Sequence, residues 1–413
     1  MSVIRLACNV NNYHWGKHGL HSKAAQFAAT NPGVSIDDTQ TYAELWMGTH
    51  ASGPSKVFGT DTSLSSIIEQ NPAQALGTLV SGKYDGQLPF LFKVLSIEKA
   101  LSIQAHPDKR LAQSLHAERP GVYKDGNHKP EMSIALTDFV AMSGFRPLDQ
   151  IAGFIEEYPE FAALVSQSAA AFVGAARQSG DDGEKRLRLR ALFAELMSAS
   201  AEDVQQQLDR LLRRVAAGTD PLDISEDALV HRLNAEYPGD VGVFCVFMLN
   251  VLRLGPGEAF FMGPNDPHAY VFGDCVECMA TSDNVVRAGL TPKLRDVPVL
   301  VDMLTYDYGT PEGKLLRPVP MAGAGCSLVY DPPIDEFSVV RTALGAGQAD
   351  ALAAVEGPQV LLAVEGKGRL LAAGEEHALL PGHVYFVCAN TALVIEADKS
   401  APLVAYTARC LAE

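Results

Sequence analysis

The sequence predicts a mainly β protein of two jelly rolls, with an α-helical unit inserted into the first. Short apolar runs bounded by glycine and proline fill residues 1–146 and return in residues 238–324, as is typical of strands in a sandwich. Between them, residues 147–237 are rich in Ala, Leu, Glu, Gln and Arg, which favours helices. Residues 325–413 repeat the pattern of strands and glycine turns. We therefore expect a discontinuous first jelly roll, a helical insertion and a C-terminal jelly roll with a structural role.

Composition and charge exclude several classes of protein. A chain of 413 residues exceeds the size at which one core usually stops growing, so two or three folding units are expected. The formal net charge of −16 argues against a general nucleic-acid surface. No apolar run reaches the length of about 20 residues that a membrane helix needs, and Met1–Cys8 lacks the features of a signal peptide. The seven scattered cysteines fit free thiols in a reducing cytosol. We expect a cytoplasmic monomer that binds neither nucleic acid nor membrane.

Residues 1–146 contain two clear strand predictions and two helix predictions. The apolar runs Pro89–Ser96 and Phe139–Phe145 are predicted to be strands. Ser65–Gln70 is predicted to be helical. A second helix is predicted over residues 108–116, because Pro107 followed by an aspartate favours a helix start.

The helical unit carries a regular apolar stripe. Its members recur at spacings of 4, 3 and 4 residues, as on an amphipathic helix, and are Val204, Leu208, Leu211 and Val215. Another helix is predicted over Leu187–Met197. The charged residues of this unit are interpreted as a solvated face.

After the helical unit, the run Val241–Leu254 is a long series of β-forming residues and predicts a buried strand. Turn signals at Pro256-Gly257 and Asp266-Pro267 flank the strand that would deliver His268. In the C-terminal jelly roll, His377 and His383 have no possible ligand two positions away. Both are interpreted as surface residues and not as a second metal site.

Gln104 and His106 are the first candidates for a metal site. Residues two apart on a strand point to the same face, so their polar ends would converge. This spacing alone is more often strand surface. Glu131, 25 residues after His106, fits the return strand of a hairpin with a long connection, and His268 supplies a second imidazole. An amide oxygen, two imidazoles and a carboxylate suit a divalent ion such as zinc. The four residues can share one ion only if the helical unit is an insertion into one sheet system.

Several blocks, in order along nearly the whole chain, resemble those of the type I mannose-6-phosphate isomerases, zinc enzymes of the cupin superfamily. The blocks are Asn12–Gly16, Met47–His50, Leu101–Lys109, His128–Met132, Pro267–His268, Asn284–Lys293 and Val301–Tyr306. The resemblance implies cupin-type jelly rolls and one zinc ion per chain, held by Gln104, His106, Glu131 and His268. It also implies interconversion of D-mannose 6-phosphate and D-fructose 6-phosphate through a cis-enediol, feeding GDP-mannose synthesis or mannose use. The chain departs from the family after His50, where Ala51–Pro54 predicts an altered loop.

Three of the candidate catalytic residues, Arg287, Lys129 and His128, lie in these blocks. An aldose–ketose isomerase needs a Lewis acid or cation beside the oxygen that becomes negative, and zinc supplies one. The resemblance implies that Arg287 is an active-site residue, which would hold phosphate or stabilise an enediolate. The alternative is a surface pair with Asp283. Lys129 is a candidate proton donor or base, and His128 a candidate for assisting ring opening. Glu277 and Asp283 remain rivals for the base.

Phosphate binding needs cations or hydroxyl groups at the mouth of the pocket. By alternation Ser102 faces as Gln104 does, and Lys93 and Lys293 lie in matching blocks. We favour Ser102 and Lys93 over Lys293, and we expect Lys109 to be solvated.

Two other functions fit a jelly roll with a metal site. A cupin dioxygenase would use iron and leave coordination positions for oxygen, but an amide ligand in place of a histidine argues against it. A sugar-binding cupin without turnover would be favoured if Arg287 pointed away from the metal.

Overall fold

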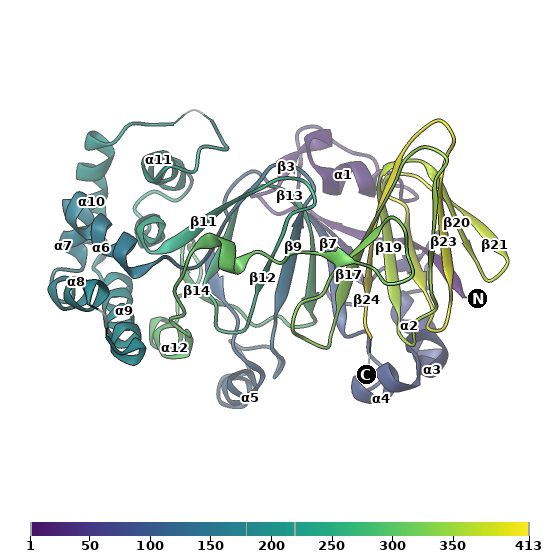
Figure 1. The fold of residues 1–413 in the computed structure, drawn as a ribbon, viewed down its shortest axis with the longest axis horizontal. Helices are drawn as coiled ribbons and strands as arrows, with labels where there is room; N and C mark the ends of the chain where they lie inside the picture. Colours follow the sequence, from purple (N-terminus) through teal and green to yellow (C-terminus); the bar gives the residue numbers. More distant parts are fainter. Residues whose placement is uncertain (1, 179, 219, 412–413) are drawn as a thin grey trace.

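The computed structural model describes residues 2–178, 180–218 and 220–411. They are arranged along one long axis, with a helical segment at one end, a large sheet in the middle and a second group of strands at the other end (Figure 1). The predicted fold class, mainly β with a helical insertion, is confirmed.

The middle sheet carries the candidate site. Its strands among the described residues are β2 (Asn9–Asn11), β5 (Glu44–Met47), β7 (Phe90–Ile97), β8 (Ile103–Ala105), β9 (Glu131–Ala135), β10 (Phe139–Phe145), β11 (Leu249–Leu254), β12 (Ala259–Met262), β13 (His268–Ala280) and β14 (Val286–Gly289). The strands predicted near residues 89–96 and 139–145 are confirmed as β7 and β10. The long strand β13 pairs antiparallel with β7, β8, β9 and β10, so it joins the segments that carry the candidate residues.

Helices fill the segment between β10 and β11. They are α6 (Leu148–Glu157), α7 (Pro159–Leu164), α8 (Ala169–Arg177), α9 (Asp182–Met197), α10 (Ala201–Arg214) and α11 (Glu226–Glu236). Strands β10 and β11 pair antiparallel with each other. The helices are therefore inserted between two neighbouring strands of one sheet, which is the condition for a shared metal site.

The helices predicted from the sequence are present. Helix α9 contains the predicted segment Leu187–Met197, and Val204, Leu208 and Leu211 are buried on α10. Residues 65–70 lie in α2 (Leu64–Gln70). Helix α5 (Lys109–Glu118) is preceded by Asp108, whose carboxylate accepts the N–H of Leu111 at 2.9 Å and so caps the first turn.

The segment Val241–Leu254 is not one strand, so that prediction is wrong. Val241–Phe247 forms the 3-10 helix η2, and only Leu249–Leu254 is a strand. The Asp240 carboxylate starts η2 by accepting the N–H of Gly242 at 2.7 Å. Every residue of η2 is buried, so its apolar, β-forming composition reflects burial and not an extended backbone.

The second group of strands forms two sheets. One contains β1 (Val3–Ala7), β6 (Lys56–Val57), β15 (Val319–Pro320), β16 (Ser327–Tyr330), β17 (Ser338–Leu344), β19 (Gln359–Gly366), β22 (Val384–Val387) and β24 (Leu403–Arg409). The other contains β18 (Ala349–Leu352), β20 (Gly368–Ala372), β21 (Glu375–Leu379) and β23 (Leu393–Ala397). The domain boundaries at residues 146, 238 and 324 stay a prediction. Strand β1 belongs by sequence to the first predicted jelly roll, but it pairs with β22 of the C-terminal segment.

Shorter elements lie around these sheets. They are β3 (Lys17–His18), β4 (Thr41–Tyr42), η1 (Gly19–His21), α1 (Lys23–Ala28), α3 (Pro72–Leu76), α4 (Thr78–Lys83), α12 (Val297–Met303) and η3 (Pro311–Lys314).

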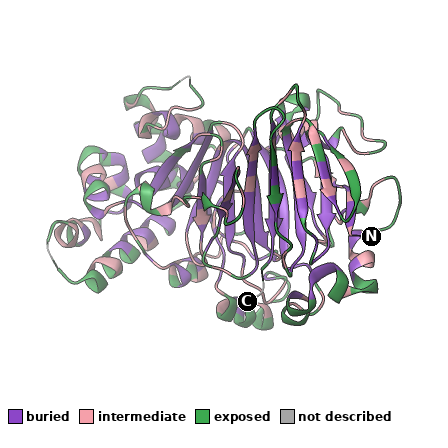
Figure 2. Ribbon diagram, turned by 45° about the vertical axis from the view of Figure 1, so that its right-hand side comes forward, coloured by how far each residue is buried: buried purple, intermediate pink, exposed green. Residues whose placement is uncertain are grey.

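The strands of both groups are mostly buried, whereas the helices alternate between buried and exposed residues (Figure 2). One apolar cluster joins the two groups, since it contains Phe92 and Ile134 of the middle sheet together with Val360 and Phe386. All seven cysteines lie among the described residues, and none forms a disulfide. Within the described part of the chain, no helix combines the length and the hydrophobicity needed to cross a bilayer.

The prediction of two surface histidines in the C-terminal segment is wrong for His383. Its side chain is buried, and Nδ1 donates to the carbonyl of Ala378 at 2.9 Å. His377 is partly exposed. Neither belongs to a metal-ligating group among the described residues.

Candidate active site

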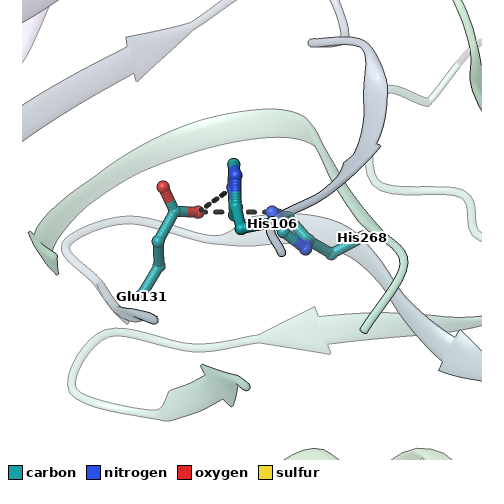
Figure 3. Close-up of side chains that lie close together, drawn as sticks. All are labelled: His106, Glu131 and His268. Atoms are coloured by element: carbon teal, nitrogen blue, oxygen red, sulfur yellow. Dashed lines mark ion pairs between the residues drawn. The ribbon is translucent and has the colours of Figure 1, made fainter. Parts of the chain in front are cut away.

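Three possible metal ligands from different strands of the middle sheet converge on one point. His106 follows directly after β8, Glu131 begins β9 and His268 begins β13. One ligand atom from each lies within 4.8 Å of the others. Glu131 Oε2 is 3.4 Å from His106 Nε2 and 3.2 Å from His268 Nε2 (Figure 3). The three residues therefore lie together, while their role as metal ligands stays a prediction. The predicted hairpin between the strands of His106 and Glu131 is wrong, because β8 and β9 do not pair with each other and both pair with β13.

Backbone carbonyls orient both imidazoles. His106 Nδ1 donates to the carbonyl of Asn284 at 2.7 Å, and His268 Nδ1 donates to that of Asp266 at 3.0 Å. A proton on Nδ1 leaves the Nε2 lone pair free, and in both rings Nε2 faces Glu131.

The three ligand atoms lack hydrogen-bond partners although they are buried. Buried polar atoms are nearly always satisfied, so three unpartnered acceptors within 4.8 Å require a specific explanation. A divalent cation would satisfy all three, and the set of two imidazoles and one carboxylate suits zinc. The residues present therefore fit a metal ion.

Charge states in this cluster favour metal binding. Burial lowers the pKa of His106 to about 4, so its ring is neutral, the form that ligates metals. Burial also disfavours the Glu131 carboxylate, but Lys129 and His106 outweigh this effect and hold its pKa well below the ordinary value. Glu131 is therefore ionised.

Gln104 lies beside this cluster on β8, which pairs with β13 on one side and with β14 on the other. It is the cross-strand partner of His268 on one side and of Arg287 on the other. The Ser102 hydroxyl donates to Gln104 Oε1 at 3.4 Å. Gln104 as a fourth ligand stays a prediction, and its register with His268 supports it.

A cavity of about 310 Å³ opens at this cluster. The predicted residues that line it are Lys93, Ser102, Gln104, Lys129, Glu131, Glu277, Arg287 and Lys293. The cavity thus brings together cations, carboxylates, an amide and a hydroxyl group from β7, β8, β9, β13, β14 and the segments next to them.

A buried ionic network forms one wall of the cavity. Lys93 Nζ is 3.1 Å from Glu277 Oε2, and the Tyr270 hydroxyl donates to Glu277 Oε1 at 2.7 Å. Burial raises the pKa of Glu277, although Lys93 opposes this. Burial alone would lower the pKa of Lys93, but the carboxylates around it raise the net value. Lys129 Nζ lies 3.2 Å from Glu131 Oε1.

Arg287 contributes a half-buried cation to the cavity. Burial lowers the pKa of its guanidinium, and among the described residues it forms no ion pair. Asp283 instead lies 3.3 Å from His50, so the alternative of an Asp283–Arg287 surface pair is wrong. Arg287 is left with its charge available to a bound ligand.

Two candidate catalytic residues lie outside the cavity lining. His128 Nε2 is 2.5 Å from Glu336 of the C-terminal segment, and Asp283 is exposed beside His50. Their proposed roles stay predictions without a cavity contact to support them. Lys109 is exposed on α5, as expected.

Several lining residues were not predicted as site residues. Tyr13, His14 and Trp15 line the cavity, and the Tyr13 and Trp15 rings stack with centroids 5.9 Å apart. Glu44 also lines it and accepts the indole N–H of Trp46. The Asn12–Gly16 block was a usable signal, because it is one of the family-like blocks and lies in a loop, where binding residues concentrate.

Known proteins are similar to this chain in sequence and in fold. Three family models of the type I phosphomannose isomerases match this chain. The model of the catalytic domain matches residues 3–148, that of the helical insertion domain residues 164–249 and that of the C-terminal region residues 327–375. The mannose-6-phosphate isomerase of Cryptococcus neoformans is 46% identical over 423 residues, covering 96% of this chain and 97% of the relative. That of Schizosaccharomyces pombe is 44% identical, covering 99% of this chain and 100% of the relative.

Solved structures agree. A mutant phosphomannose isomerase from Salmonella typhimurium superposes with a TM-score of 0.84 at 31% identity, with 100% of each chain covered. A zinc-bound mannose 6-phosphate isomerase superposes with a TM-score of 0.83 at 32% identity and the same coverage. The chain belongs to the type I phosphomannose isomerase family.

Proposed function

We propose that this protein is a zinc-dependent isomerase that interconverts D-mannose 6-phosphate and D-fructose 6-phosphate. The observation that carries the proposal is the cluster of three buried, unpartnered ligand atoms beside a cavity that also presents Arg287, Lys129 and Glu277. The relatives with this name, which match over nearly the whole chain, support it.

One zinc ion per chain would be held by His106, Glu131 and His268, with Gln104 as the fourth ligand. The bound ion would act as a Lewis acid that stabilises negative charge on a sugar oxygen. A zinc-bound structure among the similar folds supports zinc over iron, and a cupin dioxygenase has no comparable support.

Proton transfer between C1 and C2 of the sugar, through a cis-enediol, needs a group inside the cavity. Glu277 and Lys129 line it, whereas His128 and Asp283 do not. We therefore favour Glu277 and Lys129 as the proton-transfer pair. The raised pKa of Glu277 brings it closer to the range of an effective acid–base catalyst.

The remaining cations would bind the anionic parts of the substrate. Arg287, without an acidic partner among the described residues, would stabilise charge on the enediolate or hold the phosphate. Lys293 is exposed on the cavity lining, and Ser102 adds a hydroxyl group. Because Lys93 is already neutralised by Glu277, we now favour Lys293 over Lys93 for the phosphate.

Mannose 6-phosphate formed from fructose 6-phosphate would feed GDP-mannose synthesis. The reverse reaction would serve mannose use. A monomeric state and a cytoplasmic location stay predictions.

A coupled assay of chelator-stripped protein with mannose 6-phosphate tests the proposal. We expect turnover to disappear on stripping and to return when one equivalent of zinc is added back. Zinc that binds again without turnover of this substrate would contradict the assigned reaction. Turnover that is unaffected by complete removal of metal would contradict the role of zinc.

A further inference from the structure

Asp240 forms an unusual set of contacts just beyond the helical insertion. Its Oδ1 accepts the N–H groups of Gly242 at 2.7 Å and Leu290 at 2.8 Å, and its Oδ2 accepts that of Thr291 at 3.0 Å. The first bond caps η2. The other two reach a segment 50 residues away, directly after β14.

The backbones on either side of this carboxylate are in direct contact. A Cβ atom on Gly242 would lie 2.6 Å from Leu290 N, and one on Gly289 would lie 2.6 Å from Gly242 Cα. Leu290 has a positive φ of 54°, a conformation that a non-glycine residue adopts only when its surroundings impose it. The bond from Asp240 to its N–H supplies that constraint.

The segment that Asp240 holds is part of the cavity wall. Leu290, Thr291 and Lys293 all line the cavity. The same stretch continues β14, on which Arg287 lies in register with Gln104. Displacement of the turn would therefore move Lys293, the exposed cation of the lining, and the end of β14, which carries Arg287.

The end of α11 anchors the neighbouring strand in a similar way. Glu236 Oε2 accepts the N–H of Ala100 at 2.8 Å, and the Tyr237 hydroxyl donates to the Ala100 carbonyl at 2.5 Å. Ala100 lies shortly before β8 and Ser102. Residues 236–240 thus hold the segments next to both β8 and β14.

We propose that Asp240 is a positioning residue, which fixes the Leu290–Lys293 turn and with it the substrate-binding wall formed by β14. The segment that follows the helical insertion therefore reaches the active-site wall through this carboxylate. The role of the wall in substrate binding rests on the proposed isomerase function.

The test compares Asp240→Ala with Asp223→Ala, in the full-length, zinc-loaded protein. Asp223 also accepts a backbone N–H, that of Ser225 at 2.9 Å, but within the helical segment. We expect Asp240→Ala to lower kcat/KM for mannose 6-phosphate about tenfold, chiefly by raising KM. Bound zinc per chain should be unchanged, because Asp240 contacts none of the proposed ligands. Asp223→Ala should retain the wild-type KM.

A second readout does not depend on turnover. Hydrogen exchange of the peptide that contains Leu290 and Thr291 should be about tenfold faster in Asp240→Ala and unchanged in Asp223→Ala. A wild-type protein without isomerase activity would overturn the proposed function, and this exchange measurement would still decide whether Asp240 fixes the turn.

Wild-type KM together with unchanged exchange in Asp240→Ala would overturn the proposal, as would an equal rise in KM for Asp223→Ala. If the alanine variant does not fold, Asp240→Asn replaces it. Asparagine keeps one acceptor oxygen but places an amide N–H₂ against the N–H of Thr291. A rise in KM of about threefold is then expected, and an unchanged KM with unchanged exchange would overturn the proposal.

Discussion

The orientation of the two candidate histidine ligands is set by neighbours that do not themselves bind metal. The carbonyls of Asn284 and Asp266 accept from the Nδ1 atoms of the two histidines, and this turns both Nε2 atoms toward Glu131. Such partners fix the tautomer and the ring angle of a metal ligand. They are backbone atoms, so a sequence pattern of side chains does not reveal them.

Arg287 offers the sharpest test at this scale. Replacement by alanine removes the half-buried cation that lacks an acidic partner among the described residues. Loss of one preorganised charge-stabilising group typically lowers kcat by about 100-fold. We expect that loss in a steady-state assay of Arg287→Ala, with bound zinc unchanged when measured by elemental analysis.

Arg253→Ala is the matched control, because Arg253 is an exposed arginine on β11. It should retain wild-type kcat. Full activity of Arg287→Ala would contradict the active-site role, and loss of zinc from it would point to a structural defect instead.

At the scale of elements, the apolar sequence pattern did not distinguish a buried strand from a buried helix. The strand predictions for β7 and β10 succeeded because both are buried strands bounded by turn residues. The same reasoning failed for η2, where a capping aspartate and a close glycine contact produce a fully buried 3-10 helix. Apolar β-forming residues indicate a buried segment, and the backbone conformation depends on which surfaces meet there.

The turn before β22 contains a buried histidine with a predictable pH effect. Burial lowers the pKa of His383 below its ordinary value of 6.5, so the folded state resists its protonation. Its contribution to stability is complete above pH 6.5 and is lost as the pH falls below that value. We expect the urea midpoint of the wild type to fall more between pH 7.5 and 5.5 than that of His383→Gln.

His21, an exposed histidine on η1, provides the control. His21→Gln should show the wild-type dependence on pH. Equal pH dependence for His383→Gln and the wild type would show that burial of this ring does not affect acid stability.

At the scale of the molecule, the two groups of strands share a core. Ile4 on β1 is buried in the same apolar cluster as Phe92 and Val94 of the middle sheet. Ile4→Ala should cost about 2–5 kcal/mol of unfolding free energy. The chain has two tryptophans: Trp15 lines the cavity and Trp46 lies on β5 of the middle sheet. Because the two groups of strands share this core, tryptophan fluorescence and circular dichroism should both report a lower thermal midpoint in Ile4→Ala than in the wild type.

Val319→Ala is the control, since Val319 is 56% exposed, and it should shift the midpoint little. If circular dichroism shows an early transition in Ile4→Ala while tryptophan fluorescence keeps the wild-type midpoint, the two groups of strands unfold independently.

Local patterns were sufficient for the fold class, the helical insertion and the convergence of His106, Glu131 and His268, because periodicity, composition and family blocks are written along the chain. Contacts between distant segments were not accessible in this way. The pairing of β1 with β22, the Asp240 bonds to Leu290 and Thr291, and the placement of His128 outside the cavity lining all depend on long-range packing. Each is decided by which buried surfaces and hydrogen-bonding groups satisfy one another once the sheets have formed.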